Sequence, residues 1–502
     1  MLTTLAAPAF AETWYIENGD ITVKASGTEG KNTVSQGANQ EVEDTNTIIT
    51  NQKTDKASSN TVTIETNDKN DKVEVTLKDV NIDTSSRKKA AVSVTGEGDT
   101  NIKLDGDNAL KSDIYRSGIY GSGSLTISGG ENDSLTAQGG SGANGISSSG
   151  SLTISGGTVT ANGDDGGHGI YSRGGVTISG GSTVTANGRS GTISGGDGIR
   201  SDGGVTISGG TVNATGGNGG TISGGDGIRS GGGLTVSDGT VTAKGGNGDS
   251  KDGYGGDGIR SGGVVTISGN TVNAAGGYGG KVGGYGICSF DRVAISGGTV
   301  EAAGGNGSTG GGSGIYSSVI DLSGSLELTA KAGSPTGKAL LQNGRELDLD
   351  TIKDKLDPGA KVTVTDANGK VNQVSIPRPV EPEGPVIPEE SSSSSDGGSS
   401  APSAPVSSLP GLTVTDKSGA VISYTSTQSG NTLTVCVGRF TASLRASLAA
   451  LRQLRAEGIE TIAFQTVLCS TSLSVDELLA MGGEDAEAVL THRSTDSSLT
   501  VG

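Results

Sequence analysis

The fold is decided by one recurring stretch, which in its clearest copy reads Gly227-Ile228-Arg229-Ser230-Gly231-Gly232-Gly233-Leu234-Thr235-Val236-Ser237-Asp238-Gly239-Thr240-Val241-Thr242-Ala243. Each copy carries one isoleucine that marks an equivalent position, and successive marker isoleucines lie 24 to 31 residues apart. The markers are Ile119, Ile146, Ile170, Ile199, Ile228, Ile259, Ile287 and Ile315. A period of about 20 to 50 residues indicates stacked units that bury a shared core.

Each copy contains three short segments of strand length, with glycines at the corners between them. In one copy they are 170–172, 176–179 and 183–186. Alternate residues of a strand point to opposite faces, so the aliphatic residues of each segment point inward. Three strands and three turns per copy predict an all-β protein, a three-sided parallel β-solenoid that extends over about 14–376.

Composition narrows the function classes. The chain has 502 residues with 90 glycines, only 31% hydrophobic residues and 3% aromatic residues, which excludes an ordinary globular enzyme of this length. The formal net charge of -18 makes nucleic acid an unlikely partner, because phosphates repel acidic proteins. No run of about 18 apolar residues is present to span a membrane.

The chain divides into four parts. Residues 1–11 resemble the end of a signal peptide, closing on the small-x-small site Ala9-Phe10-Ala11, and predict a secreted or cell-surface protein. Residues 12–376 are the solenoid, and 377–410 form a disordered linker rich in proline and serine. Residues 411–502 predict a small α/β domain, with a helix over 441–457 between two strands and a capping box at Ser474-Val-Asp-Glu477. Its Cys436 and Cys469 either pair or remain inert thiols.

Stacking turns each outward position into a row of side chains. One position after each marker isoleucine stand Tyr120, Ser147, Tyr171, Arg200, Arg229, Arg260, Cys288 and Tyr316, which we call the outward row. Its three arginines and the tyrosines Tyr120, Tyr171 and Tyr316 predict a surface for an acidic polysaccharide, since arginine forks suit carboxylates and flat rings suit sugars. The alternative is that the arginines are only solvated partners of nearby carboxylates.

A second row stands two positions before the markers. It contains Asp197, Asp226 and Asp257, with Asn144, His168 and Tyr285 at the same position in other copies. We expect these side chains on the outside, where three neighbouring carboxylates repel unless a cation or the arginines intervene. One interpretation is that each aspartate supports a turn through hydrogen bonds to the backbone. The other is a Ca²⁺ site, because this ion prefers oxygen ligands.

Two further surface features leave their interpretation open. One glycine-rich corner varies in length between copies, which is typical of a binding loop or of a plain spacer. Threonine pairs such as Thr158/Thr160 and Thr183/Thr185 are similar to ice-binding arrays, but other copies interrupt them, and good β surface explains them equally.

The recurring phrases Asp-Gly-Ile-Arg-Ser, Leu/Val-Thr-Ile-Ser-Gly-Gly and Thr-Val-Thr-Ala resemble the clostridial secreted carbohydrate-binding β-helix family over roughly 14–330. This resemblance implies a right-handed solenoid similar to pectate lyases, binding of cellulose or acidic plant polysaccharide, and calcium in the turns at Asp197, Asp226 and Asp257. The C-terminal part is similar to short α/β tail domains of secreted Firmicutes proteins.

Repetition favours binding over catalysis. A catalytic site needs one constellation placed to within about half an ångström, whereas here Asp and Arg recur over three copies and suit avidity along a polymer. We therefore expect a non-catalytic, secreted or surface-bound carbohydrate-binding protein or adhesin. The alternatives are a polysaccharide lyase of the pectate-lyase type and a structural surface stalk.

Overall fold

The computed structural model describes residues 12–26, 30–377, 412–416, 421–422, 424–429, 431–437, 441–466, 470–481, 487–492 and 497–501. The chain forms two compact units, Met1–Pro382 and Glu383–Gly502. The signal-peptide remnant expected at 1–11 lies outside the described residues, and so does the linker expected at 377–410 except for Pro377. In the described part, no helix is long and apolar enough to cross a membrane.

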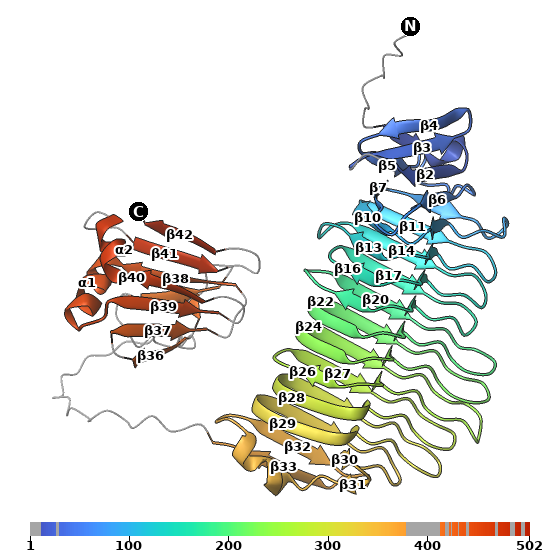
Figure 1. Ribbon diagram of the computed structural model, residues 1–502. Helices are drawn as coiled ribbons and strands as arrows, with labels where there is room; N and C mark the ends of the chain where they lie inside the picture. Colours follow the sequence, from blue (N-terminus) through green and yellow to red (C-terminus); the bar gives the residue numbers. More distant parts are fainter. Residues whose placement is uncertain are drawn as a thin grey trace, which may run out of the picture. The chain divides into compact units, whose positions relative to one another are not determined.

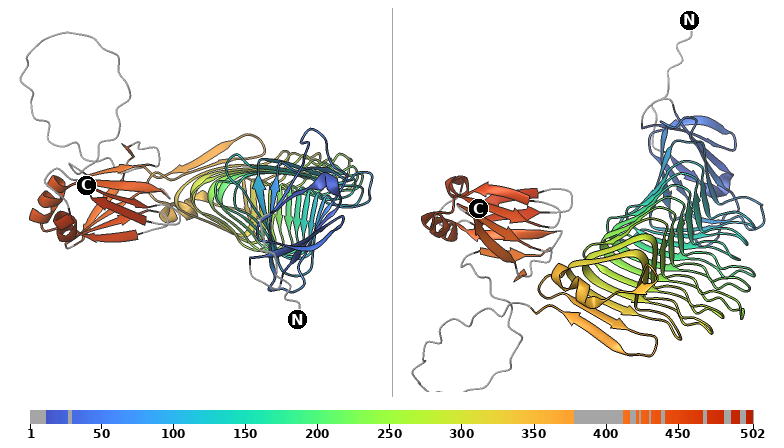
Figure 2. Two further views of the ribbon diagram at one scale, coloured as in Figure 1. Left: turned by 90° about the horizontal axis from the view of Figure 1, so that it is seen from above. Right: turned by 60° about the horizontal axis from the view of Figure 1, so that its bottom comes forward.

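The first unit is a parallel β-solenoid of about 13 turns, whose coils follow one another along its length (Figures 1 and 2). Its strands form three stacks. The first stack carries the marker isoleucines and contains β2 (Ile21–Ala25), β6 (Val62–Glu65), β9 (Val92–Thr95), β12 (Ile119–Gly121), β15 (Ile146–Ser148), β18 (Ile170–Ser172), β21 (Ile199–Ser201), β23 (Ile228–Ser230), β25 (Ile259–Ser261) and β30 (Leu340–Gln342).

The second and third stacks complete each coil. The second contains β1 (Thr13–Tyr15), β5 (Thr47–Thr50), β7 (Lys72–Lys78), β10 (Asp99–Asp105), β13 (Leu125–Ser128), β16 (Leu152–Ile154), β19 (Val176–Ile178) and β26 (Val265–Ile267). The third contains β8 (Asn81–Asp83), β11 (Asp107–Lys111), β14 (Ser134–Gln138), β17 (Thr158–Asn162), β20 (Thr183–Asn187), β27 (Thr271–Ala275) and β32 (Lys361–Thr365). Both are continued by β22 (Val205–Thr215) and β24 (Leu234–Lys244), and all three by β28 (Ile287–Ala303) and β29 (Ile315–Lys331).

The core is the predicted one. All eight marker isoleucines are fully buried, and so are the alternating aliphatics of the other two stacks, such as Ile178 and Val184. Equivalent residues pair across successive coils, for example Ile199 with Ile228 and Val205 with Leu234. Because each coil adds the same few branched side chains to one continuous core, the low apolar content suffices to fill it.

Both ends of the solenoid depart from the repeat. At the N-terminal end, β3 (Asn32–Gln36) pairs antiparallel with β2, and β4 (Asn39–Asp44) pairs antiparallel with β3. The 3-10 helix η1 (Ile16–Asn18) precedes β2. At the other end, β31 (Arg345–Glu346) and β33 (Val371–Ser375) pair antiparallel with β30 and β32, beside the 3-10 helix η2 (Leu349–Lys355). Such atypical end units protect edges that would otherwise template aggregation.

The second unit has two sheets and two helices around its own core. One sheet has the order β35 (Val421–Ile422), β34 (Leu412–Thr415), β38 (Ala442–Ser447), β41 (Glu487–His492) and β42 (Ser497–Val501). The other has the order β36 (Thr425–Ser429), β37 (Thr432–Cys436), β39 (Thr461–Gln465) and β40 (Ser470–Ser474). The helices are α1 (Leu448–Ala456) and α2 (Val475–Met481).

One element of this unit differs from the sequence prediction. Strands β37 and β39 are parallel, as a strand-helix-strand unit requires, but the helix begins at Leu448 and not at Thr441. Residues 442–447 form β38, which pairs with β34 on one side and β41 on the other. Its alternate side chains, including Leu444, are buried. The alternation of Ala442, Leu444 and Ala446 has a strand period, and Ser447 then caps α1 by accepting a hydrogen bond from the Ala450 N–H.

Candidate functional site

The outward row runs along the first strand stack in unbroken register. Tyr120 pairs with Ser147, Ser147 with Tyr171, and Tyr171 with Arg200. The three arginines then pair in succession, Arg200 with Arg229 and Arg229 with Arg260. Residues that are 24 to 31 positions apart in the sequence therefore become neighbours, at the interstrand spacing of about 4.8 Å.

A hollow of about 480 Å³, the arginine groove, runs beside the three arginines. Each arginine side chain is partly exposed, with accessible fractions of 35% for Arg200, 43% for Arg229 and 36% for Arg260. The other residues that line the groove include His168, Ser194, Asp197, Ser223, Asp226, Tyr254, Asp257 and Tyr285. The groove is therefore long, cationic along one wall, and assembled from several consecutive coils.

We expected the three aspartates on the outer surface, and this prediction was wrong. Asp197, Asp226 and Asp257 retain only 4%, 5% and 4% exposure. Each lies against the arginine three residues later in its own coil, with nitrogen-oxygen distances of 3.8, 3.7 and 3.3 Å. The corners turn these side chains toward the backbone of the next coil, so the strand alternation of the neighbouring residues does not apply to them.

The row of aspartates is a ladder of hydrogen-bond acceptors. Asp197 Oδ1 accepts from the backbone N–H of Asp226, Asp226 Oδ1 from that of Asp257, and Asp257 Oδ1 from that of Tyr285, each at 2.7 Å. In the two preceding coils, Asn144 Oδ1 accepts from the backbone N–H of His168 at 2.9 Å, and His168 Nδ1 from that of Asp197 at 2.7 Å. In these five coils the acceptor is Asn, His or Asp, so the hydrogen bond does not depend on a charged group.

Burial sets the charge of these groups. Desolvation and the neighbouring carboxylate raise the pKa of Asp226 to about 7 and that of Asp257 to about 8, and desolvation also raises the pKa of Asp197. Burial lowers the pKa of His168 to about 4, which agrees with a neutral ring whose Nδ1 accepts a hydrogen bond. At neutral pH the carboxyl groups thus compensate the three arginines only in part.

The aromatic members of the outward row are differently placed. The guanidinium of Arg200 lies 5.9 Å from the ring centre of Tyr171, which also stacks with His168 and donates a hydrogen bond to Asp202 Oδ2 at 2.8 Å. Tyr316 stacks on Tyr285, with centroids 5.0 Å apart. Both rings thus make contacts within the protein.

Cys288 also belongs to the outward row, which we expected to be exposed throughout. This was wrong for Cys288, because only 1% of it is accessible, and burial raises the pKa of its thiol. Cys436 is a free thiol among the described residues, and Cys469, its predicted alternative partner, lies outside them.

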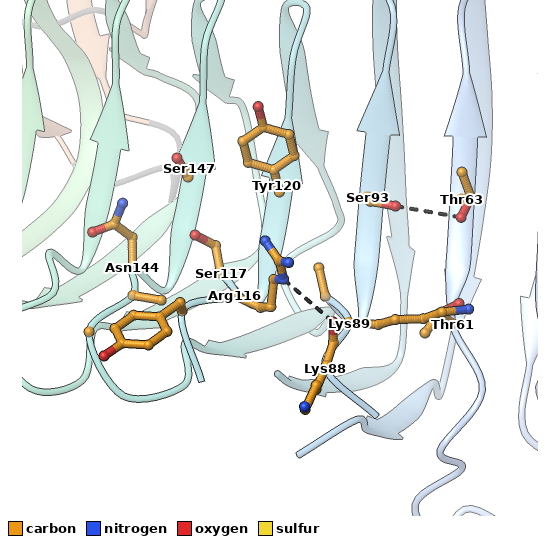
Figure 3. Close-up of a pocket in the computed structure, with 14 residues that line it drawn as sticks. Thr61, Thr63, Lys88, Lys89, Ser93, Arg116, Ser117, Tyr120, Asn144 and Ser147 are labelled. Atoms are coloured by element: carbon orange, nitrogen blue, oxygen red, sulfur yellow. Dashed lines mark hydrogen bonds between the residues drawn. The ribbon is translucent and has the colours of Figure 1, made fainter. Parts of the chain in front are cut away.

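Tyr120 belongs to a different hollow. This basic hollow, of about 630 Å³, is lined by Lys88, Lys89, Tyr115, Arg116, Tyr120 and neighbouring small residues. Figure 3 shows Tyr120 on the same face as Ser93 and Ser147, with Arg116 and the two lysines beside it. Sequence reasoning missed the cations and Tyr115. The available signal was the stretch Ile114-Tyr115-Arg116, which stands where later copies have glycine-rich corners.

The structure gives the calcium prediction no support. One oxygen of each aspartate accepts a backbone hydrogen bond, and the other faces an arginine. Within the described ranges, no group of three or more His, Cys, Asp or Glu side chains is arranged to hold a metal ion. Calcium binding stays a prediction.

The fold and its groove define a class of protein: a repeat solenoid that presents a row of cationic side chains along its length. Residues 56–310, half of the chain, match the family model of carbohydrate-binding domain-containing proteins. The chain belongs to this family, and the matched segment contains both hollows. No curated protein and no solved structure matches the chain.

Proposed function

We propose that this protein binds an acidic polysaccharide along the arginine groove and does not cleave it. Membership of a carbohydrate-binding family supports a sugar ligand. The observation that carries the acidic part is the in-register row of Arg200, Arg229 and Arg260. Guanidinium groups form paired hydrogen bonds to carboxylates, and their repetition suits a polymer with regularly spaced charges.

The buried aspartates reduce the positive charge of the arginine groove without neutralising it. Because the pKa values of Asp226 and Asp257 are raised to about 7 and about 8, these carboxyl groups are largely protonated at pH 6. The arginines are then available to an external carboxylate. Asp197 Oδ2 is buried beside the groove, where Arg200 Nη1 lies 3.8 Å from it, so this carboxyl group compensates Arg200 from within the protein.

A binding role also fits the arrangement of the charged groups. The aspartates engage the backbone of the next coil, and the same contact is repeated from coil to coil. Such repetition supplies avidity, whereas a reaction needs one distinct set of groups. We place the binding outside the cell on the strength of the apolar segment 2–11, and a mature protein in the medium that begins at Glu12 would verify export.

Replacing all three arginines by glutamine, as R200Q/R229Q/R260Q, tests the proposal. We expect binding of polygalacturonate to weaken at least about tenfold, which corresponds to about 1.4 kcal/mol. Isothermal titration calorimetry measures the affinity, and the thermal midpoint verifies folding. The matched control is K72Q/K103Q/K370Q, which removes three exposed cations away from both hollows.

Three results would change the interpretation. Unchanged affinity of the arginine variant contradicts the groove as the binding site. Release of unsaturated products from polygalacturonate contradicts a non-catalytic role and indicates a lyase. Loss of affinity in EDTA, restored by calcium, establishes the metal dependence that the resemblance implies.

A further inference from the structure

We propose that the basic hollow is a second, separate binding site, for a sugar unit that carries an anionic group, either a carboxylate or a sulfate. The proposal shares with the previous one only the assumption that the ligand is a glycan. It concerns different side chains, those of Lys88, Tyr115, Arg116 and Tyr120, on coils nearer the N-terminal end.

The first argument is charge. Lys88 and Arg116 are exposed, and neither forms an ion pair with another described residue. Lys89, by contrast, binds Asp20 at 2.9 Å, and that carboxylate also binds Arg87 at 2.8 Å. In a chain of net charge -18, two adjacent cations without acidic partners form a local site for an anion.

The second argument is backbone strain. The backbone is left-handed four positions before the start of β9, β12, β15 and β18, which lie in four successive coils. The φ angles are 54° at Lys88, 58° at Tyr115, 75° at Gly142 and 80° at Gly166. Glycine adopts this conformation freely, whereas lysine and tyrosine adopt it at a cost. The two downstream coils have glycine at this position, whereas the two coils that line the basic hollow have Lys88 and Tyr115, for which the left-handed backbone is unfavourable. Such strain is typical of functional positions.

The third argument is the presentation of the aromatic ring. Tyr115 is 76% exposed, the largest exposure of any large hydrophobic or aromatic residue in the described part of the chain. The turn that presents it is held by Asp113, whose carboxylate accepts from the backbone N–H groups of Lys88 and Ile114, each at 2.7 Å. The ring lies over Gly142, where an added Cβ would approach it to 2.8 Å. An exposed, positioned ring offers a flat face to a sugar.

The fourth argument is continuity with the outward row. Tyr120 belongs to both the row and the hollow, and three coil steps separate it from Arg200. At about 4.8 Å per step, this is about 14 Å. One extended polysaccharide can therefore occupy both hollows on the same strand stack, with a gain in avidity.

The test uses the full-length protein and two short probes, trigalacturonate and a sulfated trisaccharide, in isothermal titration calorimetry. We expect the wild type to bind two molecules of at least one probe. Y115G and K88Q/R116Q should each bind one, with at least tenfold weaker binding at the lost site. Y115G installs the residue that the next coil carries at this position, so its thermal midpoint should be equal to or above that of the wild type. The controls are Tyr278→Ala, another exposed tyrosine, and K72Q/K103Q.

The outcomes separate this site from the arginine groove. Two molecules bound by Y115G and by K88Q/R116Q overturn the basic hollow as a site. One molecule bound by the wild type, and lost only in R200Q/R229Q/R260Q, also overturns it and leaves the arginine groove intact. One molecule bound by the wild type and lost in both Y115G and K88Q/R116Q, but retained in R200Q/R229Q/R260Q, supports the basic hollow and contradicts the groove. No binding of either probe by the wild type overturns both, and preference for one probe identifies the anionic group.

Discussion

At the scale of single residues, the buried aspartates combine a structural and an electrostatic role. Asp257 accepts the backbone N–H of Tyr285 through Oδ1 and lies 3.3 Å from Arg260 through Oδ2. Its carboxyl group is buried, so its pKa rises to about 8, and Asn144 serves as the acceptor at the same position without any charge. The hydrogen bond is therefore independent of the charge, and burial makes the ionised form costly.

The D257N variant tests this separation. The folded-state pKa of Asp257 lies above the value of about 3.9 for an unfolded chain, so the folded state binds more protons and loses stability as pH rises from about 4 to about 8. Each pKa unit corresponds to about 1.4 kcal/mol. We expect D257N to show a smaller fall in thermal midpoint between pH 5 and pH 8.5 than the wild type. At pH 8.5 its thermal midpoint should be higher than that of the wild type. An unchanged slope would show that Asp257 is ionised throughout, and D238N, at a half-exposed position, is the control.

At the scale of the element, glycine permits the coils to approach each other at one corner. An added Cβ on Gly225 would lie 2.0 Å from the backbone oxygen of Gly196 in the preceding coil. An added Cβ on Gly256 or Gly284 would likewise lie 1.9 Å from the backbone oxygen of the equivalent glycine one coil before. These corners therefore need glycine for space. The contacts also hold the aspartate ladder in register, since each corner directly precedes an aspartate or its equivalent.

Gly225→Ala should consequently destabilise the solenoid, by about 1–3 kcal/mol or more, because backbone cannot move aside as a flexible side chain can. Chemical denaturation monitored by circular dichroism measures the change. The matched control is Gly181→Ala, at a turn where no atom lies within 4 Å of the added Cβ. Its stability should stay equal or rise slightly. Equal effects of the two substitutions would contradict the packing argument.

At the scale of the whole molecule, the two units have separate cores. The first core cluster extends from Trp14 to Val374 and the second from Leu412 to Leu490, with no residue in common. Both hollows lie in the first unit. Each unit therefore has the buried surface that an independent domain requires.

We expect a fragment of residues 12–382 to fold and to bind polygalacturonate with the affinity of the full chain. Calorimetry of the fragment beside the full-length protein measures both properties, and the fragment should retain one of the unfolding transitions of the full chain. A fragment that folds but binds at least tenfold more weakly would assign part of the site to the C-terminal unit.

Much of the architecture could be predicted from the sequence, for a definite reason. The marker isoleucines repeat at one period, and alternate aliphatics such as Val205 and Ile207 define which side of a strand is inside. These signals are local and are repeated many times, so they predicted the solenoid, its core and the pairing of Arg200 with Arg229. The same reasoning misplaced the start of α1, because the three alternating residues before it pack as a strand only when β34 and β41 lie on either side.

The repeat, the inward residues and the order of side chains along each row follow from the amino-acid sequence alone, because they depend on period and alternation. Tertiary structure decided where the corner residues point. Only the next coil turns Asp226 inward, to accept a backbone N–H, and only the stacked turns bring Lys88, Tyr115 and Arg116 into one hollow. Corners have no fixed period, so the direction of their side chains is set by the neighbouring coil.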